Sequence, residues 1–264
     1  MPTRDSFNKK KHKSRSKQPP KKGASDQPRP SDKFIYGMHS VQAALENPDR
    51  VIHRVRASRN AAIKLQSFLG ERKISADVVD IKELDKVLGP DVVHQGVLLE
   101  VDPLPLLELD ELDGRSPILV LDQVTDPHNV GAIIRSAAAF GVGALVMTAR
   151  NSPPLAGVLA KTASGGLEHV PVCLVGNLSR ALEELGQAGY WRLGLDGEGE
   201  ACLEDIEHTG PTALVLGAEG KGLRRLSKEN CDQIVRIKTA SSLRSLNVSN
   251  AAAVALHSVH MTMK

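Results

Sequence analysis

The segment Ser242-Leu243-Arg244-Ser245-Leu246-Asn247-Val248-Ser249-Asn250-Ala251-Ala252-Ala253 says most about the fold of this chain. Short polar side chains crowd the point where a loop turns into an Ala-rich helix. Ser249 or Asn250 suits the N-cap position, because a side-chain oxygen there can accept a hydrogen bond from a free amide of the first turn. A cap needs only one such residue, so the others indicate a site built from backbone amides and short polar groups. Taken alone, the segment also fits an ordinary capped helix.

A second segment, residues 126–137, begins with Asp-Pro-His-Asn and continues as a helix rich in small residues. It follows the apolar run 118–122, which has the pattern of a buried strand. Arg135 lies six residues after Asn129 on this otherwise apolar helix. Its planar guanidinium suits either a structural ion pair or the binding of a phosphate.

The third segment, residues 214–223, is a short apolar strand followed by a glycine-rich loop that holds one carboxylate, Glu219. Glycine permits positive φ and a close approach of the backbone to a ligand. Because Lys221 is not followed by Ser or Thr, the loop is not a Walker phosphate-binding loop, and it also lacks the Rossmann glycine pattern. The sequence Gly197-Glu198-Gly199 is interpreted as a turn only.

Taken in chain order, these segments resemble the SpoU/TrmH family of RNA ribose 2′-O-methyltransferases, a branch of the SPOUT superfamily. The family's three motifs correspond to residues 129–135, 217–222 and 245–250, and the resemblance extends over residues 116–264. Residues 36–41 and 94–97 extend it to the small N-terminal domain of the subgroup that modifies a guanosine of large-subunit ribosomal RNA.

The resemblance implies a fold, a cofactor and a set of site residues. The implied fold is α/β: a SPOUT methyltransferase domain with a parallel sheet and a trefoil knot, preceded by a small α/β RNA-binding domain of the ribosomal-protein type. S-adenosylmethionine is the implied methyl donor, with no metal, and RNA and a second copy of the chain are the implied partners. The implied catalytic residues are Asn129, Arg135, Glu219, Ser245 and Asn247, and the implied cofactor-binding residues are Gly217, Ile237 and Leu246.

Arg135 is the residue proposed in this family to activate the 2′-hydroxyl. A guanidinium with a pKa above about 12 is a poor base, so we expect Arg135 to hold the target phosphate and to stabilise developing alkoxide charge. Ser245 and Asn247 are expected to orient the hydroxyl, and Glu219 to pair with Arg135 or to hold the third motif. The homodimer is expected to pack partly through the helix that starts near Asn250.

Four regions are predicted: a disordered basic tail (1–33), a small α/β domain that binds the RNA substrate (34–102), a linker (103–115) and the methyltransferase domain (116–264). In the small domain the expected strands are 51–57, 77–80 and 96–101, and the expected helices are 40–45, 61–69 and 81–88. In the large domain the expected strands are 118–122, 144–148, 171–174, 191–195, 213–216 and 234–237, and the expected helices are 130–140, 153–160, 178–188, 223–229 and 249–262.

Charged residues of the folded regions are candidates for RNA contacts, or else parts of an ordinary solvated surface. They are Arg54, Arg56, Arg59, Lys64, Arg72 and Lys73 of the small domain, together with Lys161 and Glu168 of the large one. The net charge of +3 is unevenly placed, because residues 1–33 carry eleven Lys or Arg against three Asp, a net charge of +8. The rest carries 23 basic and 28 acidic side chains, a net charge of −5. Such a tail suits an RNA-binding arm or a solubilising segment.

No apolar run is long enough to span a membrane, and no apolar segment of the signal-peptide type follows the start, so we expect neither feature. Three widely spaced Cys and unclustered His indicate a reducing compartment without a zinc site. We therefore expect a cytoplasmic protein with no membrane or DNA partner. Two alternatives remain: a transfer-RNA 2′-O-methyltransferase, and a non-catalytic RNA-binding protein of ribosome assembly. The presence of Arg135 and Asn247 argues against the second alternative.

Overall fold

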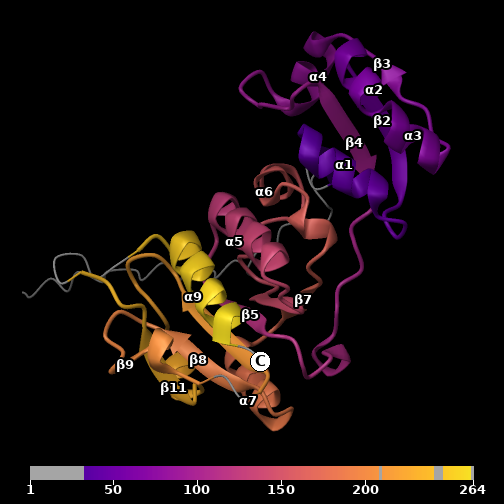
Figure 1. Ribbon diagram of the computed structural model, residues 1–264. Coiled ribbons are helices and arrows are strands. Elements are labelled where there is room, and N and C mark those ends of the chain that lie inside the picture. Colours follow the sequence, from indigo (N-terminus) through magenta and orange to yellow (C-terminus); the bar gives the residue numbers. More distant parts are fainter. Residues whose placement is uncertain (1–32, 208–209, 241–245, 263–264) are drawn as a thin grey trace, which may run out of the picture.

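The computed structural model describes residues 33–207, 210–240 and 246–262, which form two β-sheets of different size with their helices (Figure 1). Residues 1–32 of the basic tail and Ser245 lie outside the described residues. The expected α/β class, with a large parallel sheet and a smaller N-terminal domain, is confirmed.

The small sheet has the strand order β1-β4-β2-β3 and is accompanied by four helices. Its strands are β1 (Phe34–Tyr36), β2 (Ile52–Ala57), β3 (Asp77–Val78) and β4 (Val97–Val101), and its helices are α1 (Met38–Glu46), α2 (Arg59–Lys64), α3 (Gln66–Arg72) and α4 (Ile81–Leu88). The single helix expected at 61–69 is two helices, because the backbone leaves helical geometry at the fully buried Leu65, with φ −96° and ψ 2°. Strand β1 was not predicted, since three residues are too few to show a period.

The large sheet is parallel throughout, in the order β7-β6-β5-β10-β8-β11-β9. Its strands are β5 (Ile118–Asp122), β6 (Ala144–Thr148), β7 (Val172–Val175), β8 (Trp191–Leu195), β9 (Ala201–Cys202), β10 (Thr212–Gly217) and β11 (Gln233–Arg236). Its α-helices are α5 (Pro127–Ala139), α6 (Gly157–Ala163), α7 (Leu178–Gln187), α8 (Arg225–Glu229) and α9 (Val248–Thr262), and three short 3₁₀ turns complete it: η2 (Leu109–Glu111), η3 (Gly166–Glu168) and η4 (Leu203–Asp205).

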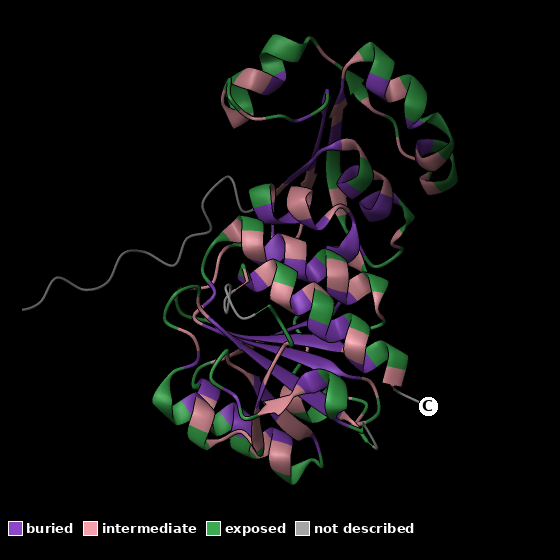
Figure 2. Ribbon diagram, turned by 60° about the vertical axis from the view of Figure 1, so that its left-hand side comes forward, coloured by how far each residue is buried: buried purple, intermediate pink, exposed green. Residues whose placement is uncertain are grey.

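Both faces of this sheet are covered, which explains why its central strands read as continuous apolar runs (Figure 2). Alternate side chains of a strand point to opposite faces. Leu119 and Leu121 of β5 join the core beneath α5, α6 and α9, whereas Ile118 and Val120 join a second core beneath α7. Because β10 lies between β5 and β8, the chain's path across the sheet changes direction at the centre. The crevice at the carboxyl ends of such strands is the usual ligand site of parallel α/β sheets.

The two sheets are joined through a buried ion pair. Arg50, near the end of the loop between α1 and β2, is 3% exposed, and its Nη2 lies 2.6 Å from Oε1 of Glu168 in η3. The second oxygen of this carboxylate accepts hydrogen bonds from Asn47 at 2.8 Å and from Nε of Arg50 at 3.1 Å. Ser40 Oγ also donates to the carbonyl of Ala160 at 2.9 Å. The expectation that Glu168 lies beside the RNA is therefore wrong: its side chain is 2% exposed and holds the small domain.

The segment expected as a linker packs against the large sheet. The amide of Leu107 donates to the carbonyl of Val172 at 2.9 Å, and Leu107, Leu109 and Leu112 pack on the core beneath α7. Because apolar residues and carboxylates alternate along this segment, it can turn its apolar side chains toward the core and its carboxylates toward solvent.

Candidate functional site

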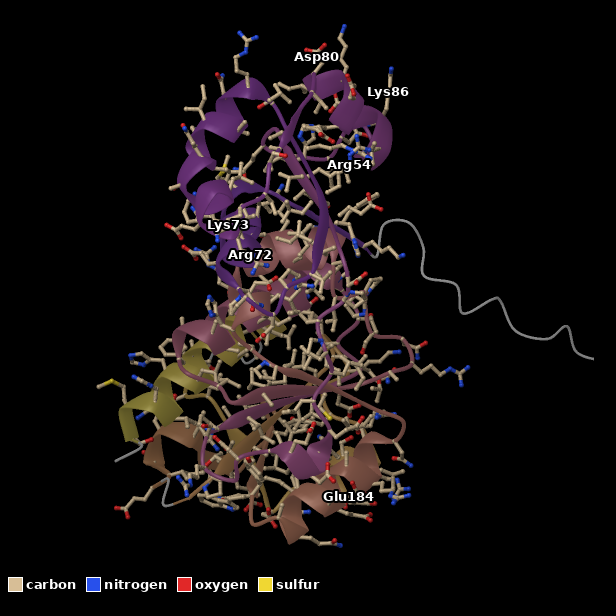
Figure 3. The ribbon with its side chains drawn as sticks, turned by 90° about the vertical axis from the view of Figure 1, so that its right-hand side faces the viewer. Arg54, Arg72, Lys73, Asp80, Lys86 and Glu184 are labelled. Atoms are coloured by element: carbon tan, nitrogen blue, oxygen red, sulfur yellow. The ribbon has the colours of Figure 1, made fainter. Side chains whose placement is uncertain are left out.

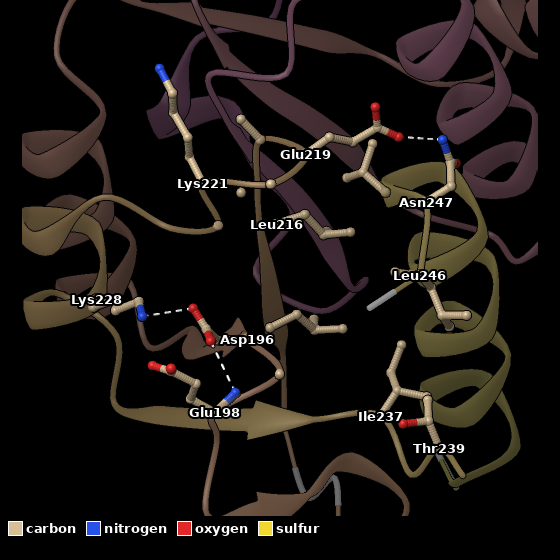
Figure 4. A pocket seen from close by; sticks show the side chains of 18 residues that line it. Asp196, Glu198, Leu216, Glu219, Lys221, Lys228, Ile237, Thr239, Leu246 and Asn247 are labelled. Atoms are coloured by element: carbon tan, nitrogen blue, oxygen red, sulfur yellow. Dashed lines mark hydrogen bonds and ion pairs between the residues drawn. The ribbon is translucent and has the colours of Figure 1, made fainter. Parts of the chain in front are cut away.

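A pocket of about 560 Å³ opens at the carboxyl ends of β8, β10 and β11 and at the start of α9 (Figure 4). A pocket of this size is in the range of small-molecule sites. Five of the residues predicted from the sequence for the site line it: Gly217, Glu219, Ile237, Leu246 and Asn247. The sheet therefore brings together groups that are up to thirty residues apart in the chain.

The glycine-rich loop forms one wall of the pocket. Gly220 and Gly222 have φ of +73° and +63°, in the left-handed region that favours glycine. A Cβ on Gly217 would collide with the backbone of Gly222, so the loop folds back tightly after β10. The amide of Gly222 donates to the carbonyl of Ala218 at 2.9 Å and closes this turn. At Gly217, Gly220 and Gly222 the loop therefore presents only backbone to the pocket.

Three chain segments meet in a hydrogen-bonded cluster at the edge of this pocket. Asn247 Nδ2 donates to Oδ1 of Asn129, at the start of α5, at 3.1 Å, and also to Oε1 of Glu219 in the glycine loop. Asn247 Oδ1 accepts from the amide of Ser249 at 2.9 Å and from its hydroxyl at 2.5 Å, and it also accepts from the amide of Asn250 at 3.4 Å. The N-cap of α9 is therefore Asn247, not Ser249 or Asn250. Asn247 therefore has two roles: its oxygen caps α9, and its amide nitrogen binds the side chains of Asn129 and Glu219.

Arg135 does not join this cluster. Six residues of α-helix separate it from Asn129, a rise of about 9 Å along the axis. Its side chain is exposed, and within the described part of the chain no hydrogen bond or ion pair engages it. It lines a separate groove beside α1, and it is absent from the residues that line the pocket. The expected pairing with Glu219 is not found.

The floor of the pocket contains an ion pair that sequence reasoning missed. Asp196 Oδ2 lies 2.7 Å from Nζ of Lys228, and Asp196 Oδ1 accepts from the amide of Glu198 at 3.0 Å (Figure 4). Burial raises the pKa of Asp196, but the hydrogen bond and charge of Lys228 together with the hydrogen bond from the amide of Glu198 outweigh it and hold that pKa below its ordinary value. The same contact raises the pKa of Lys228. Asp196 directly follows the expected strand 191–195 and precedes Gly197-Glu198-Gly199, which the sequence predicts only as a turn.

Two thiols are held protonated at neutral pH. Burial raises the pKa of Cys173 to about 11 and that of Cys231 to about 12. Since the thiolate is the nucleophilic form, neither side chain suits covalent catalysis. Among the described residues, no group of three or more His, Cys, Asp or Glu could hold a metal ion. None of the helices in the described ranges is long and apolar enough to cross a membrane.

Figure 3 labels Arg54 and Arg72 on the small domain, two of the basic residues expected to contact RNA. Both already have protein partners. Arg54 Nε lies 2.6 Å from Oδ2 of Asp77, with both side chains about half exposed. Arg72 donates to the carbonyls of Pro48 and Arg50, at 3.2 and 2.6 Å, and so supports the domain junction.

The parallel sheet, the pocket at its carboxyl edge and the polar cluster at the start of α9 define an α/β protein with a pocket of small-molecule size between the glycine loop and the helix α9. The chain belongs to the SpoU rRNA methylase family, whose model matches residues 116–257. A second model, described as RNA 2′-O ribose methyltransferase substrate binding, matches residues 34–107.

Named relatives agree with this assignment. The chain is 41% identical over 233 residues to the 23S rRNA (guanosine-2′-O-)-methyltransferase RlmB of Pseudomonas syringae pv. tomato, covering 84% of this chain and 92% of that protein. It is 42% identical to the Ralstonia nicotianae protein of the same name, covering 85% and 93%. Among solved structures, the SpoU methyltransferase AviRb from Streptomyces viridochromogenes, in complex with AdoMet, has the same fold. Its TM-score is 0.72 at 24% identity, covering 86% of this chain and 89% of that one.

Proposed function

We propose that this protein transfers a methyl group from S-adenosylmethionine to the ribose 2′-oxygen of a guanosine in 23S ribosomal RNA. The observation that carries the proposal is the meeting of Asn129, Glu219 and Asn247 at the edge of the pocket. Two named 23S rRNA methyltransferases, similar to this chain over more than nine-tenths of their own length, support the substrate class.

The residues of the pocket suit S-adenosylmethionine. Leu195, Leu216 and Ile237 give it an apolar part that can receive an adenine ring. Asp196 and Glu219 supply carboxylates, which match the ammonium group and the sulfonium of the cofactor. We assign Gly217, Ile237 and Leu246 to cofactor binding. The bound cofactor would supply a methyl group on a sulfonium for in-line attack by the ribose hydroxyl.

The polar cluster would orient that hydroxyl. Asn129 and Glu219 place an amide and a carboxylate at the edge of the pocket, and Asn247 holds both. Ser245 is proposed to contribute a hydroxyl beside them. A guanidinium is a cation with several N–H donors, so Arg135 would stabilise the developing alkoxide and bind the adjacent phosphate.

The position of Arg135 makes a homodimer part of this proposal. Its groove and the pocket share no lining residue, so one subunit does not place Arg135 at its own cofactor. A second copy would bring Arg135 of the partner subunit to the pocket, with α9 contributing to the contact. Val254 and Met261 of this helix are 42% and 68% exposed, which fits a covered face in an assembly. A trefoil knot in the large domain and a cytoplasmic location complete the proposal.

The test compares Arg135→Ala and Arg135→Lys with the unchanged protein, using unmodified 23S rRNA and transfer RNA as substrates. Single-turnover methylation should fall at least about 100-fold in both variants, because a point charge does not replace the planar guanidinium. Cofactor affinity, measured by calorimetry, should stay within about twofold. Methylation of transfer RNA alone would favour the transfer-RNA alternative, whose support is a fold likeness to an A. aeolicus TrmH/SpoU tRNA modifying enzyme over 58% of this chain. No methylation of either RNA would refute the proposal.

A further inference from the structure

A groove of about 440 Å³ lies where α1 of the small domain faces α5 and η3 of the large one. From α1 it is lined by His39, Gln42 and Glu46, which are spaced i, i+3 and i+7 and so share one face of the helix. Arg135 of α5 and His169, just after η3, line it from the other side. The groove therefore belongs to neither domain alone.

The polar groups of this groove have no use within the described residues. No hydrogen bond or ion pair engages the side chain of any of the five residues just named, and four of them, all except Gln42, are exposed. Phe68 of α3 also lines the groove and adds an aromatic surface. Cationic, amide, carboxylate and aromatic groups together are the set that recognises a nucleotide.

Two glycines set the width of the groove. A Cβ on Gly165 would lie 2.8 Å from Cβ of Ala43 in α1, and a Cβ on Gly166 would lie 3.1 Å from Cα of Arg135 in α5. Helix α1 thus approaches the turn more closely than a side chain at Gly165 would permit, and α5 lies in tight contact with Gly166. The buried pair of Arg50 and Glu168, on the same turn, fixes α1 in this position. The groove is consequently a built feature of the junction.

We propose that this groove binds the target guanosine, and that Glu46, supported by Gln42, reads the base while Arg135 holds its ribose and phosphate. The assignment rests on the proposed function. Guanine presents two donors, N1–H and the exocyclic amine, to a group on its Watson–Crick edge. A carboxylate accepts from both, and adenine offers no such pair. Glu46 is the carboxylate among the groove residues, and it stands at the end of the stripe formed by His39, Gln42 and Glu46.

The sharpest test pairs a protein change with a base change. The guanosine methylated by the unchanged protein is first mapped, and RNA carrying inosine at that position, which lacks the exocyclic amine, is then prepared. Inosine should lower kcat/KM about tenfold for the unchanged protein, and Glu46→Gln should lower it roughly 10- to 100-fold for guanosine. With Glu46→Gln, guanosine and inosine should differ less than twofold, because the contact is already lost.

Glu71→Gln is the matched control, since Glu71 is an exposed carboxylate of the same domain outside the groove. This variant should keep both the rate and the inosine penalty. Cofactor affinity should be unchanged in both variants. If Glu46 had only a structural role, Glu46→Gln would lower methylation by the same factor for guanosine and for inosine. A full inosine penalty in Glu46→Gln would overturn the proposal.

A readout that needs no activity separates this proposal from the proposed function. 23S rRNA containing 6-thioguanosine is photo-crosslinked to the whole protein, and crosslinked peptides are identified by mass spectrometry. Crosslinks to residues 38–46 or 166–169 are expected. Crosslinks that form only at other residues would overturn the proposal.

Diethylpyrocarbonate should modify His39 in the RNA-free protein. If His39 is protected from modification, a second copy of the chain fills the groove and the proposal is overturned. Groove crosslinks without methylation would refute the proposed function alone.

Discussion

Replacement of Glu168 by Ala should uncouple the small domain from the large one. In the folded protein the Glu168 carboxylate accepts hydrogen bonds from both Nη2 and Nε of Arg50 and from Asn47. Arg50 Nη1 in turn donates to the carbonyl of Asp102 at 2.9 Å. Both members of the pair have side chains that are 2% exposed. The substitution therefore leaves a guanidinium buried at the junction without its counter-charge.

The cost follows from this burial. Removing one partner of a buried ion pair destabilises a protein by about 3–5 kcal/mol, because the remaining charge stays desolvated. Exposed pairs contribute only about 0.2–1 kcal/mol. Arg225 and Glu229 form an exposed pair with side chains 76% and 51% accessible, so Glu229→Ala is a matched control with an expected cost below about 1 kcal/mol. Replacing both junction partners by apolar residues, with Arg50→Met and Glu168→Leu together, should cost less than Glu168→Ala alone.

The assay is urea unfolding at neutral pH, followed by far-ultraviolet circular dichroism, together with methylation of 23S rRNA. Glu168→Ala should lower the free energy of unfolding by about 3–5 kcal/mol or separate unfolding into two transitions. It should also raise KM for RNA more than it lowers kcat, because α1 loses its fixed place beside Arg135 while the cofactor pocket is untouched. If Glu168→Ala costs no more than Glu229→Ala, the buried pair does not hold the junction.

Three further changes have defined outcomes. Asn247→Asp keeps the oxygen that caps α9 but places a second carboxylate against Glu219. Methylation should therefore fall at least about tenfold, while the free energy of unfolding falls by less than about 1 kcal/mol. Equal losses of stability in Asn247→Ala and Asn247→Asp would contradict the separate roles of the capping oxygen and the amide group. Lys228 beside Asp196, and Arg192 at 2.6 Å from Asp232, hold the pKa values of these carboxyls below their ordinary values. The stability they contribute is therefore present above about pH 4 and is lost as the pH falls through their folded values, so the midpoint of thermal unfolding should drop below about pH 4, and less so in Asp232→Asn. Deletion of residues 1–33, which carry a net charge of +8, should weaken RNA binding and reduce its dependence on salt concentration. The methylated nucleotide should stay the same, because phosphate contacts carry no sequence information. If the dependence of RNA affinity on salt is unchanged, only the solubilising role is left for the tail.

The strands β5, β6 and β10 of the large sheet were predictable because they are buried on both faces. The expected strands 118–122 and 144–148 match β5 and β6 residue for residue, and 191–195 also matches β8, although β8 is only partly buried. A strand made of a continuous apolar run can be recognised from its own residues, without knowledge of the strands that pair with it. Strand order and register were not predictable in the same way, since β10 pairs with β5 across almost one hundred residues of sequence. That pairing depends on tertiary packing, which no local pattern records.

The candidate site was predictable in part for a similar reason. Gly217, Glu219 and Asn247 lie in local motifs whose residue types already indicate loops and caps. Asp196 and Lys228 come from segments without a motif, and only the pairing of β8 with β10 brings Asp196 into the pocket. The pairing of Glu168 with Arg50 was invisible for the same reason, because 118 residues separate them.

The hydrogen bonds of Asn247 also decide which atoms of the cluster are left for a substrate. An amide side chain has two donor hydrogens and one acceptor oxygen. Both donors of Asn247 are used, on Asn129 and on Glu219, and its oxygen is used by the first turn of α9. Asn247 therefore has no free hydrogen to offer a ribose hydroxyl. We infer that it is a positioning residue, and that the free amide hydrogens of Asn129 and the second oxygen of Glu219 are the atoms that would orient the hydroxyl. Asn129→Ala should consequently lower methylation with α9 still capped, whereas loss of Asn247 should displace the cluster and the start of the helix together.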